Sequence, residues 1–221
     1  MERESGRGSS DLATFAQALT TLKREGSNLL LVGADTADVH HAICHRLLGE
    51  TSHGSRYRLF VTNGDDRRVA HERDSTTETM RMIDYAALER AALDVPTASD
   101  RTPIGRLGIE IIEAIDDLEA VAHGLDPAEL RVCVDSLVPL LEEHAAETVF
   151  RLLQMTTSRV DRARGMGHYH LPLDRAHEAV VLFEPLFDAI VEVRSRGDSY
   201  EQQWDLRDRG LTTDWLPLSR R

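Results

Sequence analysis

The stretch that decides the fold is NLLLVGADTADVHHAICHRLL, residues 28–48. It opens with an apolar run over residues 29–32, which is too short for a helix and suits a central strand buried on both faces. Gly33 ends this run, and apolar residues then recur at helical spacing as far as Leu48. The stretch therefore predicts a strand, a tight loop and a helix, which is the setting of a phosphate-binding loop.

The predicted loop lacks most of the residues that bind phosphate. A phosphate-binding loop begins and ends with Gly, followed by a Lys for the terminal phosphates and a Ser or Thr for Mg²⁺. Gly33 takes the first Gly position, whereas Asp38 stands at the second, Val39 replaces the Lys and His40 replaces the Ser or Thr. We therefore predict a vestigial nucleotide site, with no cofactor and no catalytic residues.

A nucleotide site also needs an acidic residue at the end of a buried strand, where it holds Mg²⁺ through water. Asp135 fits, because it follows the apolar residues 132–134 and precedes Ser136 and a predicted helix. An Asp at such a junction is more often only a helix N-cap. The Gly33 loop upstream favours the nucleotide-site interpretation.

Strands and helices alternate along the rest of the chain. We expect further strands over residues 57–62, 80–85, 131–135 and 166–171, and a final hairpin from residues 190–194 and 200–206. Helices are expected over residues 9–26, 104–120, 137–160 (broken near His144) and 176–186. This order predicts a three-layer α/β domain with a mostly parallel sheet and an antiparallel C-terminal edge. We expect a flexible N-terminus over residues 1–10, one domain over residues 11–206, and a tail over residues 207–221 that docks on it.

The order of elements resembles the RecA/KaiC-like branch of the P-loop NTPases. More narrowly, four stretches resemble uncharacterised haloarchaeal proteins labelled HTR-like: residues 22–30 (LKREGSNLL), 134–137 (VDSL), 165–172 (GMGHYHLP) and 211–217 (LTTDWLP). The resemblance extends over nearly the whole chain, and none of these motifs is catalytic. It implies a RecA-like fold and a role near signal transduction, with no established reaction.

The resemblance to the RecA/KaiC-like ATPases can be compared residue by residue. Gly33 matches the first Gly of the loop and Asp135 matches the acid on the Mg²⁺ side, whereas Asp38, Val39 and His40 depart from the pattern. RecA/KaiC-like ATPases also place a catalytic Glu just beyond the strand that follows the loop helix. Here Asp65 and Asp66 stand near that place, and Asp is shorter by one methylene. The resemblance therefore implies the scaffold of an ATPase without its activity.

Net charge and composition limit the classes of molecule that the protein is expected to bind. The formal net charge is -12, and Lys23 is the only lysine among 26 basic residues. High acidity with Arg in place of Lys favours adaptation to a salt-rich cytoplasm, although a GC-rich genome also favours Arg codons. This charge argues against nucleic acid, whose binding depends on neutralising phosphates. No stretch approaches the length of a membrane span, and residues 1–10 lack the apolar core of a signal peptide, so we expect a cytoplasmic protein.

Cysteines and histidines were considered as metal ligands. Cys44 and Cys133 fall on a predicted helix and a predicted buried strand, and we expect reduced thiols there. His40, His41, Cys44 and His45 contain i, i+4 pairs, and His168 and His170 share one face of a strand. No second ligand pair stands at suitable spacing in the sequence, so we expect surface or partly buried histidines on the helix, packed polar histidines on the strand, and no metal.

These observations favour a non-catalytic regulatory or interaction module that has kept a P-loop scaffold. A protein partner is expected, and a homo-oligomer is one possibility. The competing interpretations are an ATPase with an unorthodox loop, completed by a basic residue of a partner, and a module that binds a nucleotide or other small ligand without turning it over.

Overall fold

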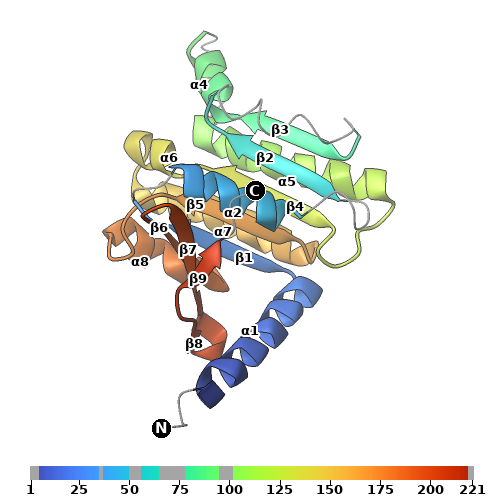
Figure 1. Ribbon diagram of the computed structural model, residues 1–221. Coiled ribbons are helices and arrows are strands. Elements are labelled where there is room, and N and C mark those ends of the chain that lie inside the picture. The colour runs from blue at the N-terminus through green and yellow to red at the C-terminus, as the bar shows by residue number, and fades with distance from the viewer. Residues whose placement is uncertain (1–4, 35–36, 50–55, 65–77, 95–101, 219–221) are drawn as a thin grey trace.

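The computed structural model describes residues 5–34, 37–49, 56–64, 78–94 and 102–218 (Figure 1). Within these residues, nine strands form one sheet in the order β3-β2-β4-β5-β1-β6-β7-β8, with β9 also paired to β7. The strands are β1 (Ser27–Val32), β2 (Tyr57–Thr62), β3 (Met80–Asp84), β4 (Leu130–Asp135), β5 (Met166–Leu171), β6 (Ala189–Arg196), β7 (Ser199–Leu206), β8 (Leu211–Thr212) and β9 (Leu216–Leu218).

Strands β1 to β6 are mutually parallel, and β7, β8 and β9 add an antiparallel edge. Strand β1 lies between β5 and β6, and all six of its residues are buried. Leu30 and Val32 face one hydrophobic cluster while Leu29 and Leu31 face another, because side chains alternate along a strand. The predicted α/β class, with a mostly parallel sheet and an antiparallel C-terminal edge, is confirmed.

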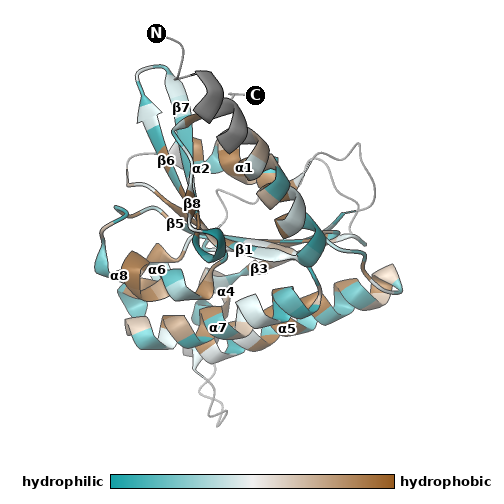
Figure 2. Ribbon diagram, turned by 90° about the horizontal axis from the view of Figure 1, so that it is seen from below, coloured by the Kyte–Doolittle hydropathy of each residue, from teal (hydrophilic) through white to brown (hydrophobic). Residues whose placement is uncertain are grey.

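Helices cover both faces of the sheet (Figure 2). Helices α1 (Ser5–Glu25) and α2 (Ala37–Leu48) lie on one face, and α5 (Pro103–Ala122) and α7 (Ala146–Arg162) lie on the other. The larger core cluster also includes residues of α4 (Tyr85–Asp94), α6 (Val138–Glu143) and α8 (Glu178–Phe183), which is followed by the 3-10 turn η3 (Glu184–Leu186). A second 3-10 turn, η4 (Arg207–Arg209), precedes β8.

Most predicted elements occur close to their expected bounds, and the differences lie mainly at the ends of elements. The expected third strand includes Tyr85 and no helix is expected after it, whereas in the structure Tyr85 begins α4. The predicted break near His144 is confirmed, because this residue has an extended backbone (φ -132, ψ 151) between α6 and α7. Helix α8 begins at Glu178 rather than near residue 176, and Pro185 lies in η3, because a proline cannot continue a helix interior.

The C-terminal residues pair with the sheet. Strand β9 places Leu218 opposite Tyr200, and Leu218 is buried in the cluster that contains Phe15 and Trp204. The Trp215 ring stacks under the Arg194 guanidinium, 3.7 Å from its central carbon. The division into a flexible N-terminus, one domain and a docked tail stays a prediction.

Candidate functional site

Gly33 directly follows β1 at the carboxyl edge of the parallel sheet, the edge at which open parallel sheets bind ligands. Its backbone has φ +131, and a Cβ at this position would lie 2.2 Å from the carbonyl oxygen of Val193. Its N–H donates to the carbonyl oxygen of Leu173 at 2.9 Å. The turn after β1 therefore requires Gly, as it does in a phosphate-binding loop, because only Gly tolerates both the positive φ and the close approach.

Val39, at the position of the phosphate-binding Lys, is fully buried. It belongs to the apolar cluster that includes Leu31 and Ile43, beneath α2. Asp38 precedes it in the first turn of α2 and is exposed. A carboxylate there suits the positive end of the helix dipole, but it repels a phosphate. Asp38 therefore places a carboxylate where a phosphate-binding loop has a Gly. Val39 places a buried aliphatic side chain where such a loop has the cation of a Lys.

His40, at the position of the Mg²⁺-binding Ser or Thr, turns into the protein and is 2% exposed. Its Nε2 lies 3.1 Å from the Gly33 carbonyl oxygen, and its Nδ1 lies 3.0 Å from His170 Nδ1. A carbonyl only accepts, so Nε2 of His40 carries the proton. With the proton on Nε2, Nδ1 of His40 accepts from the Nδ1–H of His170. The expectation of a surface or partly buried histidine is wrong for His40, because this hydrogen-bonded chain holds it inside.

Asp135 lies at the end of β4, opposite Thr62 at the end of β2, and is 6% exposed. Strand β5 separates β4 from β1, so Asp135 and Gly33 end strands at the same edge of the sheet. Just beyond, the Leu137 N–H donates to the His170 carbonyl oxygen at 2.8 Å. Asp65 and Asp66, considered as substitutes for a catalytic Glu, lie outside the described residues.

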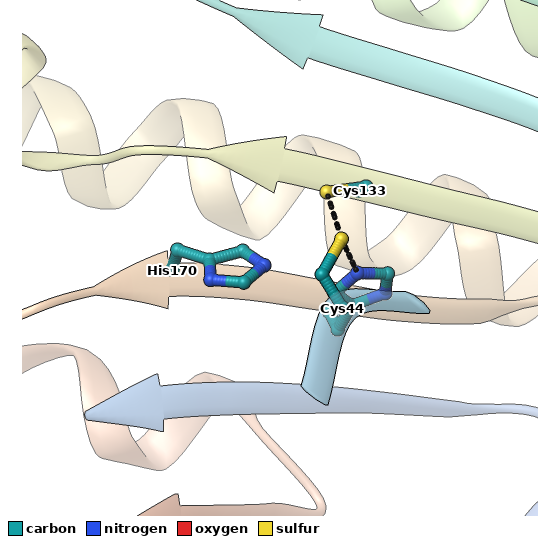
Figure 3. Close-up of side chains that lie close together, drawn as sticks. Cys44, Cys133 and His170 are labelled. Atoms are coloured by element: carbon teal, nitrogen blue, oxygen red, sulfur yellow. Dashed lines mark hydrogen bonds between the residues drawn. The ribbon is translucent and has the colours of Figure 1, made fainter. Parts of the chain in front are cut away.

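A second group of functional side chains lies buried between α2 and the sheet. Cys44 Sγ lies 3.4 Å from Cys133 Sγ and 3.2 Å from His168 Nε2. One ligating atom each from Cys44, Cys133, His168 and His170 lies within 4.8 Å of all the others. Figure 3 shows the outer edge of the His170 ring pointing toward Cys44, whose sulfur lies next to that of Cys133. The structure thus brings two thiols and two imidazoles together in the interior.

The electrostatics of this cluster favour the ligating forms of Cys44 and His168. The hydrogen bond with Cys133 lowers the pKa of Cys44 well below its usual value, and His168 adds to this while burial opposes it. Burial lowers the pKa of His168, which favours the neutral imidazole. A thiolate and a neutral imidazole are the forms in which Cys and His bind metal ions.

The two i, i+4 pairs on α2 lie on different faces of the helix, one turned toward the sheet and one toward solvent. His40 and Cys44 are buried, whereas His41 and His45 are exposed and stacked, with ring centroids 4.7 Å apart.

The expectation that no second ligand pair would join Cys44 is wrong, because Cys133, His168 and His170 lie beside it. Cys133 on β4 stands directly opposite His168 on β5, and neither neighbour is close to Cys44 in sequence. The alternation of His168 and His170 was the one signal in the sequence that pointed to this cluster. Cys133 lies beside them only because β4 and β5 are adjacent in the sheet, which the sequence spacing does not reveal.

A third group of titratable side chains lies where α4 meets α6. It contains Glu89, Glu143 and His144, of which Glu143 is exposed. A hydrogen bond shared with Glu89, assisted by burial, raises the pKa of Glu143 to about 7. The Tyr85 hydroxyl hydrogen-bonds His144 and fixes this corner against the core.

Comparison with known proteins places the chain in a family. The profile of the Family of unknown function (DUF7504) matches residues 26–193, which include the loop after β1 and the Cys–His cluster. The chain belongs to this family. No curated protein matches this DUF7504 chain.

Among solved structures, the DUF7504 chain is similar to the crystal structure of a KaiC-like protein from the hyperthermophilic archaeon Pyrococcus horikoshii OT3. The TM-score is 0.57 at 12% sequence identity, and the match covers 87% of this chain and 85% of the other. At this identity the likeness establishes the fold, which is that of the RecA/KaiC-like proteins. Among the described residues of the DUF7504 protein, no helix has the length and apolar character needed to cross a membrane.

Proposed function

We propose that the protein is a non-catalytic regulatory module, associated with signal transduction, that keeps the RecA-like scaffold and acts through a protein partner. The observation that carries the proposal is the burial of Val39. A phosphate-binding Lys at this position would have to place its charge in the apolar cluster beneath α2 or leave that position altogether. We include in this proposal that the protein is related to the haloarchaeal HTR-like proteins.

The contacts of His40 add support. Its Nε2–H donates to the Gly33 carbonyl oxygen at 3.1 Å, so it stands beneath the loop instead of facing a bound Mg²⁺. A Ser or Thr at this position offers a hydroxyl to the metal. The described ends of the loop are therefore held by hydrogen bonds within the protein. The charged side chain among these described residues is Asp38, whose carboxylate would repel a phosphate.

The ATPase alternative is supported by Gly33 and Asp135, which keep their positions at one edge of a RecA-like sheet. A phosphate-release assay with ATP and Mg²⁺ at about 2 M KCl separates the two functions. The proposal predicts no release above the rate without protein, for both the natural protein and Asp135→Asn. Protein-dependent release that Asp135→Asn abolishes would contradict it and establish the ATPase.

The partner is tested separately. Tagged protein recovered from its native lysate at high salt should carry one other protein in stoichiometric amount, and added ATP should not release it. Recovery of the chain alone, over a range of salt concentrations, would contradict the interaction part of the proposal.

A further inference from the structure

We propose that Cys44, Cys133, His168 and His170 form a buried tetrahedral site for Zn²⁺ beneath α2. The proposal is independent of the function proposed above, because the cluster lies under the helix and involves no nucleotide. Two thiolates and two imidazoles are the donors of structural zinc sites, and four protein ligands leave no position for a substrate. The expected role is to fasten α2 to the sheet.

The positions of the donor atoms fit a zinc tetrahedron after small shifts. With Zn–S near 2.3 Å and Zn–N near 2.0–2.1 Å, the edges of such a tetrahedron are about 3.8 Å between sulfurs and about 3.6 Å between sulfur and nitrogen. Here the corresponding distances are 3.4 Å for Cys44 to Cys133 and 3.2 Å for Cys44 to His168. These two edges need to lengthen by only a few tenths of an ångström to admit the ion, and the other donor pairs all lie within 4.8 Å.

The sheet arranges three of the four ligands in advance. Cys133 on β4 and His168 on β5 are partners across adjacent parallel strands. His168 and His170 are two residues apart on β5 and so project from the same face of the sheet. Cys44 then comes down from α2 onto this face, next to Phe60 and Leu48. A metal bound here would join one helix to two central strands.

The hydrogen bonds of His170 orient it as a ligand. The Gly33 carbonyl oxygen accepts from the Nε2–H of His40, and Nδ1 of His40 accepts from the Nδ1–H of His170. The proton of His170 is therefore on Nδ1. This leaves the Nε2 lone pair of His170 on the outer edge of its ring, which points toward Cys44 (Figure 3). A metal-binding His ordinarily donates its other N–H to such a partner, which fixes its tautomer and raises its basicity.

A buried cluster of this kind is costly without an ion. Thiols are weak hydrogen-bond donors, and four titratable groups have been removed from water beneath α2. A disulfide between Cys44 and Cys133 would require the sulfurs to move from 3.4 Å to about 2.05 Å, with an external oxidant. Zinc engages all four groups at once and requires no redox change.

Cobalt substitution tests the proposal directly. The full chain, produced without a His tag, is stripped of metal with a chelator under reducing conditions, and one equivalent of Co²⁺ is added. We expect the intense visible bands of tetrahedral Co²⁺ and near-ultraviolet thiolate-to-cobalt bands, both displaced by one equivalent of Zn²⁺. Reduced, folded protein that gives neither band and retains no Zn²⁺ would overturn the proposal, as would a disulfide that persists in reductant.

Variants separate the buried cluster from the surface of the same helix. Cys44→Ser should lose the thiolate bands, and His40→Ala should weaken Zn²⁺ binding by about 10- to 100-fold through loss of the support to His170. The matched control is the double variant His41→Gln, His45→Gln, which removes the exposed i, i+4 pair and should leave spectrum and affinity unchanged. Circular dichroism shows whether Cys44→Ser folds; if it does not, the spectrum of the natural protein decides. Thiolate bands that survive Cys44→Ser at full strength would overturn the assignment.

Discussion

His40 Nε2 lies 3.1 Å from the carbonyl oxygen of Gly33, so the residue at the Mg²⁺ position of a phosphate-binding loop is hydrogen-bonded to the residue at its first position. The same imidazole contacts His170 through Nδ1 at 3.0 Å. His40 thus connects the end of β1 to β5 and to the Cys–His cluster. The residue that the sequence pattern aligns with the Mg²⁺-binding position of a phosphate-binding loop therefore makes hydrogen bonds inside the protein.

His40→Ala should destabilise the protein by about 1–3 kcal/mol, because it leaves the buried groups that face it at Gly33 and His170 without this hydrogen-bond partner. Urea unfolding at fixed salt and under chelation measures the change free of any metal contribution. The matched control is His41→Ala, one residue along on the exposed side of α2, which should stay within about 0.5 kcal/mol. Equal effects of the two substitutions would contradict the structural role of His40.

Trp204→Ala should cost about 3–5 kcal/mol, as large aromatic truncations in cores do. Trp204 is 6% exposed and contacts Phe15 edge to face, with ring centroids 5.6 Å apart, so its side chain faces the core. Trp215→Ala is the control, since this half-buried ring lies under Arg194 and should cost about 1 kcal/mol or less. A loss below about 1 kcal/mol for Trp204→Ala would place its side chain in solvent.

Much of this fold could be predicted because its signals are local. The apolar run before Gly33, the alternation in β7 and the helical spacing in α5 each depend on neighbouring residues alone. Helix α4 was missed because the expected strand was extended through Tyr85, whose buried aromatic ring suits a strand as well as a helix start. The Cys–His cluster was missed for a different reason. Strand order decides that Cys133 stands beside His168, and spacing in the sequence carries no information on strand order.

The stability of the protein should depend on pH through Asp161. Burial, together with the charge of Asp188, raises the pKa of Asp161 to about 6, although its carboxylate accepts from the Asn28 side chain at 2.6 Å. In the unfolded chain this pKa is near 3.9, so between about pH 3.9 and 6 the native state binds the proton more tightly. The contribution of Asp161 to stability is therefore largest in acid and is lost as the pH rises through this range.

Asp161→Asn removes this titration. The Tm of the variant, relative to that of the natural protein, should rise from about pH 4 to 6 and then level off, with a modest amplitude because Asp161 is partly exposed. Thermal unfolding in one buffer series at constant salt measures it. Asp117→Asn, on the exposed side of α5, is the control and should show no such trend. A difference for Asp161→Asn that does not vary with pH would contradict the assignment.

Salt should stabilise the protein. The net charge of -12 repels itself, and a Debye length near 3 Å at about 1 M removes most of that repulsion. We expect the thermal midpoint to rise steadily from about 0.1 to 3 M KCl, and sodium chloride to act similarly at equal ionic strength. A midpoint that stays flat or falls would contradict the expected adaptation to a salt-rich cytoplasm.

The loop after β1 is not expected to bind a triphosphate. Loss of the Lys removes a charge-assisted contact worth roughly 1.5–3 kcal/mol. A carboxylate at position 38 that approaches a phosphate charge to about 4 Å adds a repulsion of about 4 kcal/mol at an effective dielectric near 20. The sum of about 6 kcal/mol would weaken a micromolar site by about four decades.

Calorimetric titration of ATP with Mg²⁺ into the natural protein at about 2 M KCl measures this directly. We expect no saturable heat up to millimolar ATP, and the same trace from Asp135→Asn. Saturable binding with a Kd below about 1 mM that Asp135→Asn weakens would contradict it, because the ligand would then occupy the nucleotide site.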